Sequence, residues 1–189
     1  MENTPLEYHV SQDLIKVFQS QAKQKVQAEK WTGRNTDIKI ANFVHCWITE
    51  EAFKQLLIQH HIWFRYRGLY FGDAKGAGAD FIVKINGTET SIGLRSIAPE
   101  SLNRWKSVAY PDDRFRLEQD KIAKYHIVCN HANGLTRFFG AISKEQLLDE
   151  LGRSERKYSK TNQEYFRIIS LEKFSFENLI TLLEKMQKV

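Results

Sequence analysis

The spacing of hydrophobic and polar residues predicts two helices in the first third of the chain. Between residues 9 and 30, apolar side chains recur every three or four positions, which is the pattern of a helix with one buried face. Residues 38–61 contain more apolar side chains than a one-sided helix needs, so we expect a second helix there that is mostly buried. The turn-forming residues Gly33, Asn35 and Asp37 separate the two helices.

The middle of the chain has the patterns of strands and tight turns. Asn86-Gly87 and Asn133-Gly134 each stand between two apolar runs, and the first of these pairs strongly favours a hairpin turn. The glycine-rich stretch of residues 68–78 predicts a loop. We expect strands at residues 62–67, 80–85, 89–97, 125–130 and 135–142.

The remaining segments predict further helices and one exposed loop. Ser143 and Gln146 form a capping-box pattern at the start of a helix that ends at Leu151. We also expect a helix or loop at 99–109, a helix at 112–124, a polar and basic exposed loop at 152–163, and a closing helix at 176–186. This order of elements predicts an α/β (α+β) fold with a mixed β-sheet flanked by helices.

Length and composition indicate the number of domains, the type of partner and the cellular compartment. A chain of 189 residues with 42% hydrophobic content is expected to form a single domain, with residues 1–37 as an N-terminal helical extension and residues 38–189 as the core. Its formal charge of +5 favours polyanionic partners. Only two cysteines occur, without paired spacing, and no apolar stretch approaches the roughly 20 residues of a spanning helix. We therefore expect a soluble protein of the cytoplasm with no membrane partner.

The predicted hairpin places chemically useful residues together. Asp80 opens its first strand, and Gly93 and Arg95 share one face of its second strand, because alternate residues of a strand point the same way. This arrangement resembles the hairpin of the PD-(D/E)XK (restriction endonuclease-like) nuclease superfamily, in which an Asp opens one strand and a Glu-x-Lys group lies on the next. The resemblance covers residues 40–145. It implies a restriction endonuclease-like core and a metal-dependent endonuclease that hydrolyses DNA.

Two positions depart from the superfamily motif. Asp80 matches the motif Asp, but Gly93 stands in place of the Glu, and Arg95 in place of the Lys. Arginine cannot release a proton at working pH, although its guanidinium can hold a phosphate. Superfamily members often add a carboxylate from the helix before the hairpin, which implies Glu50 or Glu51; we favour Glu50, whose spacing from Phe53 and Leu57 places it on the buried side.

The resemblance also implies a cofactor and a partner. Asp80 with Glu50 or Glu51 would bind Mg²⁺ or Mn²⁺, since hard cations prefer carboxylate oxygens. The expected substrate is double-stranded DNA, and a homodimer that cuts both strands is compatible with the sequence. Tyr158 lies within the last group of candidate DNA-contacting cations and could stack on a sugar or base. The candidate cations are Arg65, Arg67, Lys75, Arg104, Lys106, Arg114, Arg116, Arg153, Arg156, Lys157 and Lys160.

Two other functions fit the same sequence. Gly93 and Arg95 are compatible with a catalytically degenerate relative that binds nucleic acid without cutting it, and the apolar helices are compatible with an accessory protein that binds a protein partner. The cysteine and histidine residues are expected to have packing or surface roles rather than to form a zinc site or a Cys/His dyad. Asp112 and Asp113 follow Pro111, where helix capping explains them.

Overall fold

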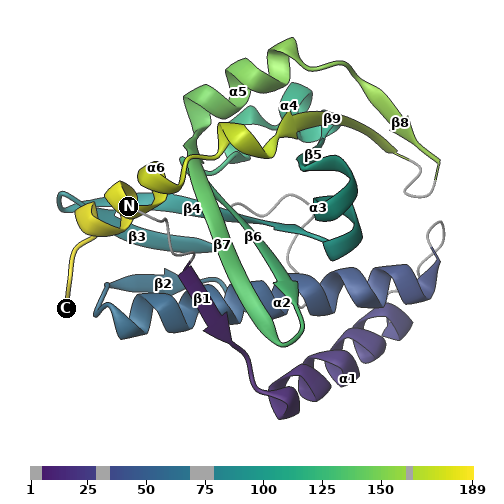
Figure 1. The fold of residues 1–189 in the computed structure, drawn as a ribbon, viewed down its shortest axis with the longest axis horizontal. Coiled ribbons are helices and arrows are strands. Elements are labelled where there is room, and N and C mark those ends of the chain that lie inside the picture. The colour runs from purple at the N-terminus through teal and green to yellow at the C-terminus, as the bar shows by residue number, and fades with distance from the viewer. Residues whose placement is uncertain (1–5, 29–34, 69–78, 161–163) are drawn as a thin grey trace.

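The architecture comes from a computed structural model, which describes residues 6–28, 35–68, 79–160 and 164–189. The predicted glycine-rich loop therefore lies almost entirely outside the described residues, and so does the candidate DNA contact Lys75. Figure 1 shows how the helices and strands are arranged. The elements are β1 (Leu6–His9), α1 (Gln12–Ala28), α2 (Thr36–Gln59), β2 (Phe64–Tyr66), β3 (Phe81–Ile85), β4 (Thr88–Ile97), α3 (Pro99–Trp105), β5 (Ser107–Pro111), α4 (Asp112–Leu117), η1 (Gln119–Lys121), β6 (Tyr125–Ala132), β7 (Leu135–Ser143), α5 (Lys144–Arg153), β8 (Lys157–Ser159), β9 (Glu164–Ser170), η2 (Leu171–Lys173) and α6 (Phe176–Lys185).

A six-stranded mixed sheet forms the centre of the molecule. Its strand order is β1-β7-β6-β4-β3-β2, in which β4 and β6 run parallel and the other neighbours run antiparallel. The connection from β4 to β6 passes through α3, β5, α4 and η1, since parallel neighbours need a long crossover. The predicted α/β fold with a mixed sheet and flanking helices is confirmed.

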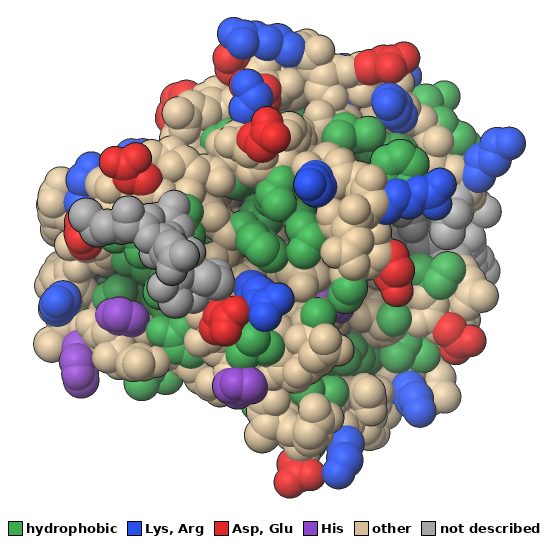
Figure 2. All heavy atoms as spheres, in the orientation of Figure 1, with side chains coloured by type: hydrophobic (Ala, Val, Ile, Leu, Met, Phe, Trp, Pro, Cys, Tyr) green, Lys and Arg blue, Asp and Glu red, His purple; other side chains and the backbone are tan. Residues whose placement is uncertain are grey.

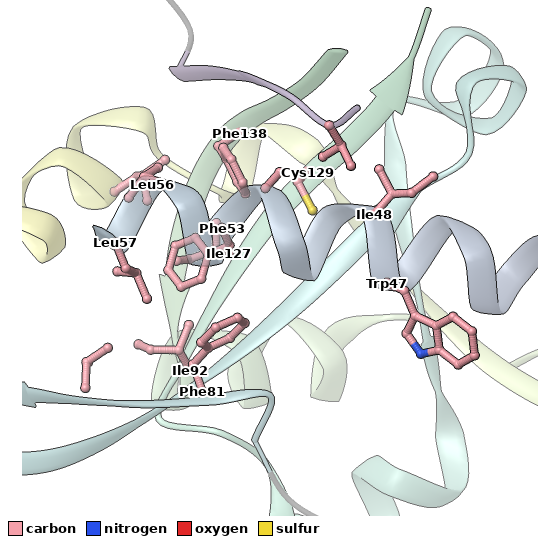
Figure 3. Packing of buried hydrophobic residues seen from close by; sticks show 14 of the residues in the cluster. Trp47, Ile48, Phe53, Leu56, Leu57, Phe81, Ile92, Ile127, Cys129 and Phe138 are labelled. Atoms are coloured by element: carbon pink, nitrogen blue, oxygen red, sulfur yellow. The ribbon is translucent and has the colours of Figure 1, made fainter. Parts of the chain in front are cut away.

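Helix α2 packs across one face of this sheet. Phe53, Leu56 and Leu57 are fully buried and contribute to a core with Phe81 and Phe138 from the strands (Figure 3). The ring of Phe53 contacts that of Phe81 edge-on at a centroid distance of 5.1 Å and that of Phe138 in a tilted arrangement at 5.7 Å. Helix α1 packs on α2, so the central helix is covered on both sides. This packing fixes the position of Glu50, in the middle of α2, relative to the sheet.

The two asparagine-glycine pairs form the tight turns that the sequence predicts. Asn86 and Gly87 have φ values of 50° and 78°, and Asn133 and Gly134 have 53° and 78°. Positive φ at both central residues is the signature of the hairpin turn whose twist matches that of the strands. The first turn sets the β3–β4 register, in which Phe81 faces Ile92 and Ile85 faces Thr88.

A second layer on the opposite face of the main sheet contains elements that the sequence pattern did not predict. Strands β5, β9 and β8 form a three-stranded antiparallel sheet, which packs with α5 over a second apolar core. The predicted exposed loop at residues 152–163 is wrong where β8 forms, and the predicted helix or loop at 99–109 is wrong where β5 begins. Both strands are short and pair with β9, which lies far from β5 in the sequence, so no local pattern indicates them.

The ends of the chain also join the main sheet. Strand β1 pairs with β7, which adds a strand to a segment where the sequence predicts only helix. The segment between η2 and α6 passes close to β7 at Gly140, where any Cβ would overlap the Phe174 carbonyl, so only glycine allows this close approach. Within the described residues, no helix combines the length and apolarity that crossing a membrane requires.

Candidate functional site

A cavity of about 260 Å³ lies where the main sheet meets the second layer. Strand β4 continues to Ile97, beyond its last β3 partner at Ile92, and this extension forms one wall. Helix α2 reaches the cavity from one side, and β5, α4 and β6 reach it from the other. Its lining includes six polar or charged side chains with possible functional roles: Glu50, Asp80, Arg95, Tyr110, Arg114 and His126.

Asp80 is fixed at the end of the hairpin by the backbone of β4. Its Oδ2 accepts a hydrogen bond of 2.7 Å from the Leu94 N–H, and its Oδ1 lies 3.4 Å from the Arg67 guanidinium. The side chain is 19% exposed. Burial raises the pKa of Asp80, and the Leu94 amide and the charges of Arg67, Arg95 and Arg114 oppose that rise. Asp80 is thus a positioned carboxyl group at the cavity wall.

The structure separates the two candidate carboxylates of α2. Glu50 is buried, lines the cavity, and accepts a hydrogen bond of 2.7 Å from the Tyr66 hydroxyl. That carboxylate is one reason, after burial, that the pKa of Tyr66 is raised far above its usual value. Glu51 lies outside the cavity lining and is bound instead by Lys54 at 2.7 Å and by Gln55. Of the two, only Glu50 is placed with Asp80.

Gly93 stands opposite His126 in the parallel β4–β6 ladder. A Cβ at position 93 would lie 2.9 Å from His126 Nδ1 and 3.0 Å from Cε1, closer than real side chains approach. The imidazole therefore takes the space that a side chain at position 93 would need. The sequence identified the missing carboxylate, whereas only the strand pairing identifies the residue that has taken its space.

Several buried polar atoms of the described cavity lining have no hydrogen-bond partner. Four lining residues that the structure describes have buried side-chain polar atoms with no hydrogen-bond partner: Arg95 Nε, Ser96 Oγ, Tyr110 OH and both ring nitrogens of His126. The Arg95 guanidinium lies over the Tyr110 ring at 4.4 Å, and the His126 ring meets Tyr110 edge-on at 5.9 Å. Each unpaired group costs about 1–3 kcal/mol of desolvation, which a ligand that supplies hydrogen-bond partners would recover.

Positive charge outweighs negative charge around the cavity. Among the lining residues that the structure describes, four are cations, Arg67, Arg95, Arg114 and Lys121, and two are carboxylates, Glu50 and Asp80. Arg67 and Arg114 also bind carboxylates, Asp80 and Glu118 respectively. Donors and cations around a small cavity suit an anion with several oxygens, such as a phosphate.

Most of the candidate DNA-contacting cations are held in ion pairs on the described surface. Arg65 binds Glu89, Arg153 binds Asp149, and Arg116 and Arg156 both bind Asp112, at distances of 2.8–3.0 Å. Arg104 stacks on Trp105, while Lys106, Lys157 and Lys160 are exposed. On the face drawn in Figure 2, blue and red side chains are interspersed rather than gathered in one basic patch. Contact between these residues and DNA stays a prediction.

The cysteine and histidine side chains near the cavity do not resemble a nucleophile pair. Cys46 is exposed, and the nearby negative charges of Glu50 and Asp80 disfavour its thiolate form. His45 is bonded to the Ile97 carbonyl at 3.2 Å, and its ring packs against that of His131. Among the described residues, no group of three or more His, Cys, Asp or Glu side chains is placed to hold a metal ion.

The buried imidazole of His126 predicts acid sensitivity. Burial, and then the charge of Arg95, lowers its pKa well below 6.5, so between about pH 6.5 and the folded-state pKa only the unfolded chain takes up this proton. Stability is then lost as the pH falls, by up to about 1.4 kcal/mol per pH unit. We expect His126→Gln to reduce the slope of unfolding free energy against pH, measured by urea denaturation between about pH 6.5 and 5. Equal slopes for the two proteins would contradict this assignment.

Comparisons with known proteins assign no family. No protein-family model matches the chain, and a search of curated proteins finds no match. Among solved structures, the chain is similar to D212, a nuclease from a fusselovirus, with a TM-score of 0.39, 14% sequence identity and coverage of 94% of both chains. A likeness of this extent does not establish a common fold.

Proposed function

We propose that this chain is a Mg²⁺-dependent endodeoxyribonuclease, related to the PD-(D/E)XK nucleases, that binds the scissile phosphate of DNA in the cavity. One observation carries the proposal: buried donors without partners line the same small space as two carboxylates, the buried Glu50 and the partly exposed Asp80. A phosphodiester has oxygens that pair with the donors. The carboxylates supply the negative ligands that a catalytic cation requires.

Arg95 is the expected phosphate ligand. Its Nε is buried and unpaired, and its guanidinium lies over the Tyr110 ring at 4.4 Å, which limits the positions that the side chain can take. Arginine presents donors in a rigid fork that matches two phosphate oxygens at once. The Tyr110 hydroxyl and Ser96 Oγ also line the cavity and could donate to a third oxygen.

Glu50 and Asp80 fit the way in which magnesium is usually bound. Mg²⁺ commonly has one or two protein carboxylates as ligands, and substrate phosphate and water complete its coordination. A cation there would lower the pKa of a bound water and neutralise charge on the phosphate. The Leu94 N–H and the Tyr66 hydroxyl orient the two carboxylates. Double-stranded DNA is the proposed substrate, and the charge of +5 supports binding to it.

Cleavage of supercoiled plasmid tests this proposal. We expect the purified chain to nick the plasmid in Mg²⁺ or Mn²⁺ and to lose this activity in EDTA and in Asp80→Ala, because that variant loses one of the two carboxylates. Asp13→Ala is the matched control, since Asp13 lies on α1 with its side chain 93% exposed. Nicking that persists in Asp80→Ala, or in EDTA, would refute the proposed site.

A second candidate function is nucleic-acid binding without cleavage. It is favoured by the position of the His126 ring, which fills the space of a third carboxylate beside Gly93. A protein of this kind binds DNA equally well with or without a divalent cation and does not nick plasmid. A gel shift in EDTA beside the cleavage assay separates the two candidates.

A further inference from the structure

A larger groove of about 780 Å³ adjoins the cavity. The two spaces share four lining residues, among them Arg95 and Ser96, so a ligand bound in one can continue into the other. The groove runs between the end of β4 with α3 on one side and the three-stranded sheet β5-β9-β8 on the other. Figure 1 shows this sheet and α3 beside the end of β4.

The lining of the groove is mainly apolar, with two cations. Trp105, whose surface is 62% exposed, and Phe166 provide aromatic rings, and four serines provide hydroxyl groups. Arg95 and Lys157 are the charged residues among the described lining, and both are positive. Aromatic rings, hydroxyls and a few cations without a carboxylate match nucleotides that present a base as well as a phosphate.

The strands of the second sheet point a distinct set of side chains into the groove. Lys157 and Phe166 are cross-strand partners and both line it. Tyr158 and Tyr165 are the next pair along the same strands, so they lie on the opposite face, where their rings contact each other at 5.0 Å. Tyr158, which the sequence indicates as a stacking residue, therefore points away from the groove.

We propose that this groove binds a single-stranded segment of the nucleic acid, next to the phosphate in the cavity. The inference rests on the proposed function and narrows its substrate to DNA that is unpaired beside the cleavage site. The bases of a duplex are stacked on each other, so they cannot lie against Trp105 or Phe166, and a duplex is bound chiefly through phosphate-neutralising cations. The part of the lining that the structure describes has few cations and two aromatic rings, which are the features of single-strand binding.

Binding of a fluorescein-labelled oligothymidylate, measured by anisotropy in EDTA, tests the groove without cleavage. We expect Trp105→Ala and Phe166→Ala each to weaken binding roughly 5- to 150-fold, the effect of losing one stacked base. Tyr165→Ala is the matched control, because it removes a half-exposed aromatic from the other face of the same sheet, and its Kd is expected to equal that of the wild type. Binding of a blunt duplex is expected to be insensitive to all three changes.

The outcomes separate this inference from the proposed nuclease activity. Unchanged oligothymidylate binding by Trp105→Ala would overturn the groove proposal, and so would an equal loss in Tyr165→Ala or in duplex binding. Because Trp105 is exposed, its variant tests the proposal even if Phe166→Ala does not fold. Selective loss of oligothymidylate binding in a protein that never nicks plasmid would support the groove while the nuclease proposal fails.

Discussion

Replacing Asp112 with alanine is expected to lower the free energy of unfolding by about 3–5 kcal/mol, the cost of removing one partner from a buried ion pair. Its side chain has no exposed surface and contacts Arg167 at 2.6 Å and both Arg116 and Arg156 at 2.8 Å. Arg167 is only 15% exposed, so its charge would remain buried without a counterion. Urea denaturation of the two proteins at neutral pH measures the difference.

The neighbouring aspartate provides the control for this prediction. Asp113 has a side chain that is 77% exposed and contacts Arg116 alone, at 3.3 Å, so Asp113→Ala is expected to cost about 0–1 kcal/mol. Although burial opposes them, the hydrogen bond and charge of Arg167, with Arg116 and Arg156, hold the pKa of Asp112 below its usual value. Its contribution is thus present at neutral pH and is lost below about pH 4. A loss in Asp112→Ala no larger than in Asp113→Ala would contradict the central role of this carboxylate.

The ion pairs of Asp112 also involve two candidate DNA contacts, Arg116 and Arg156. Arg116 and Arg156 have side chains 45% and 41% exposed, but their charges are partly neutralised by the carboxylate they share. Asp112 is not the helix cap that the sequence indicates, since Pro111 occupies the cap position of α4. Its interaction with Arg167 instead joins α4 to β9, so substitutions at these arginines will change stability as well as any binding.

Local signals explain which parts of the fold the sequence predicts. The helices follow from apolar spacing, and the hairpins from Asn86-Gly87 and Asn133-Gly134, because each of these patterns acts within a few residues. The second sheet depends on partners such as Ser107 and Ser170, which are far apart in the sequence. A three-residue strand such as β8 has too few positions to show alternation.

In the candidate site, too, local sequence patterns indicate some residues, whereas others reach the cavity only through tertiary pairing. Asp80 and Arg95 belong to one hairpin, and the helical spacing of Glu50 places it on the buried side, so the sequence could indicate all three. Tyr110 and His126 reach the cavity through the β4–β6 crossover and the second sheet, which sequence spacing does not reveal. The groove combines α3, β4 and the second sheet, so it too depends on tertiary pairing.

The His126 ring occupies the space that a side chain at position 93 would need, so the effects of substitutions at these two positions on stability are expected to be strongly coupled. Gly93→Glu alone is expected to destabilise the chain by more than about 3 kcal/mol, because overpacking against the imidazole adds to the burial of a charge. In Gly93→Glu/His126→Ala the ring is absent, and the carboxylate can take its place beside the cavity. The double variant should therefore be more stable than the sum of the two single changes by about 0.5–3 kcal/mol.

The double variant also tests how the missing carboxylate limits cation binding. A glutamate at position 93 would place a third carboxylate beside Glu50 and Asp80. The Mn²⁺ concentration that gives half-maximal plasmid nicking is therefore expected to fall below that of the wild type. Gly93→Ala/His126→Ala is the control, since it makes the same space without adding a ligand. If both double variants respond to Mn²⁺ alike, the carboxylate at position 93 has no access to the cation. If the stabilities are strictly additive, His126 is not what excludes a side chain from position 93.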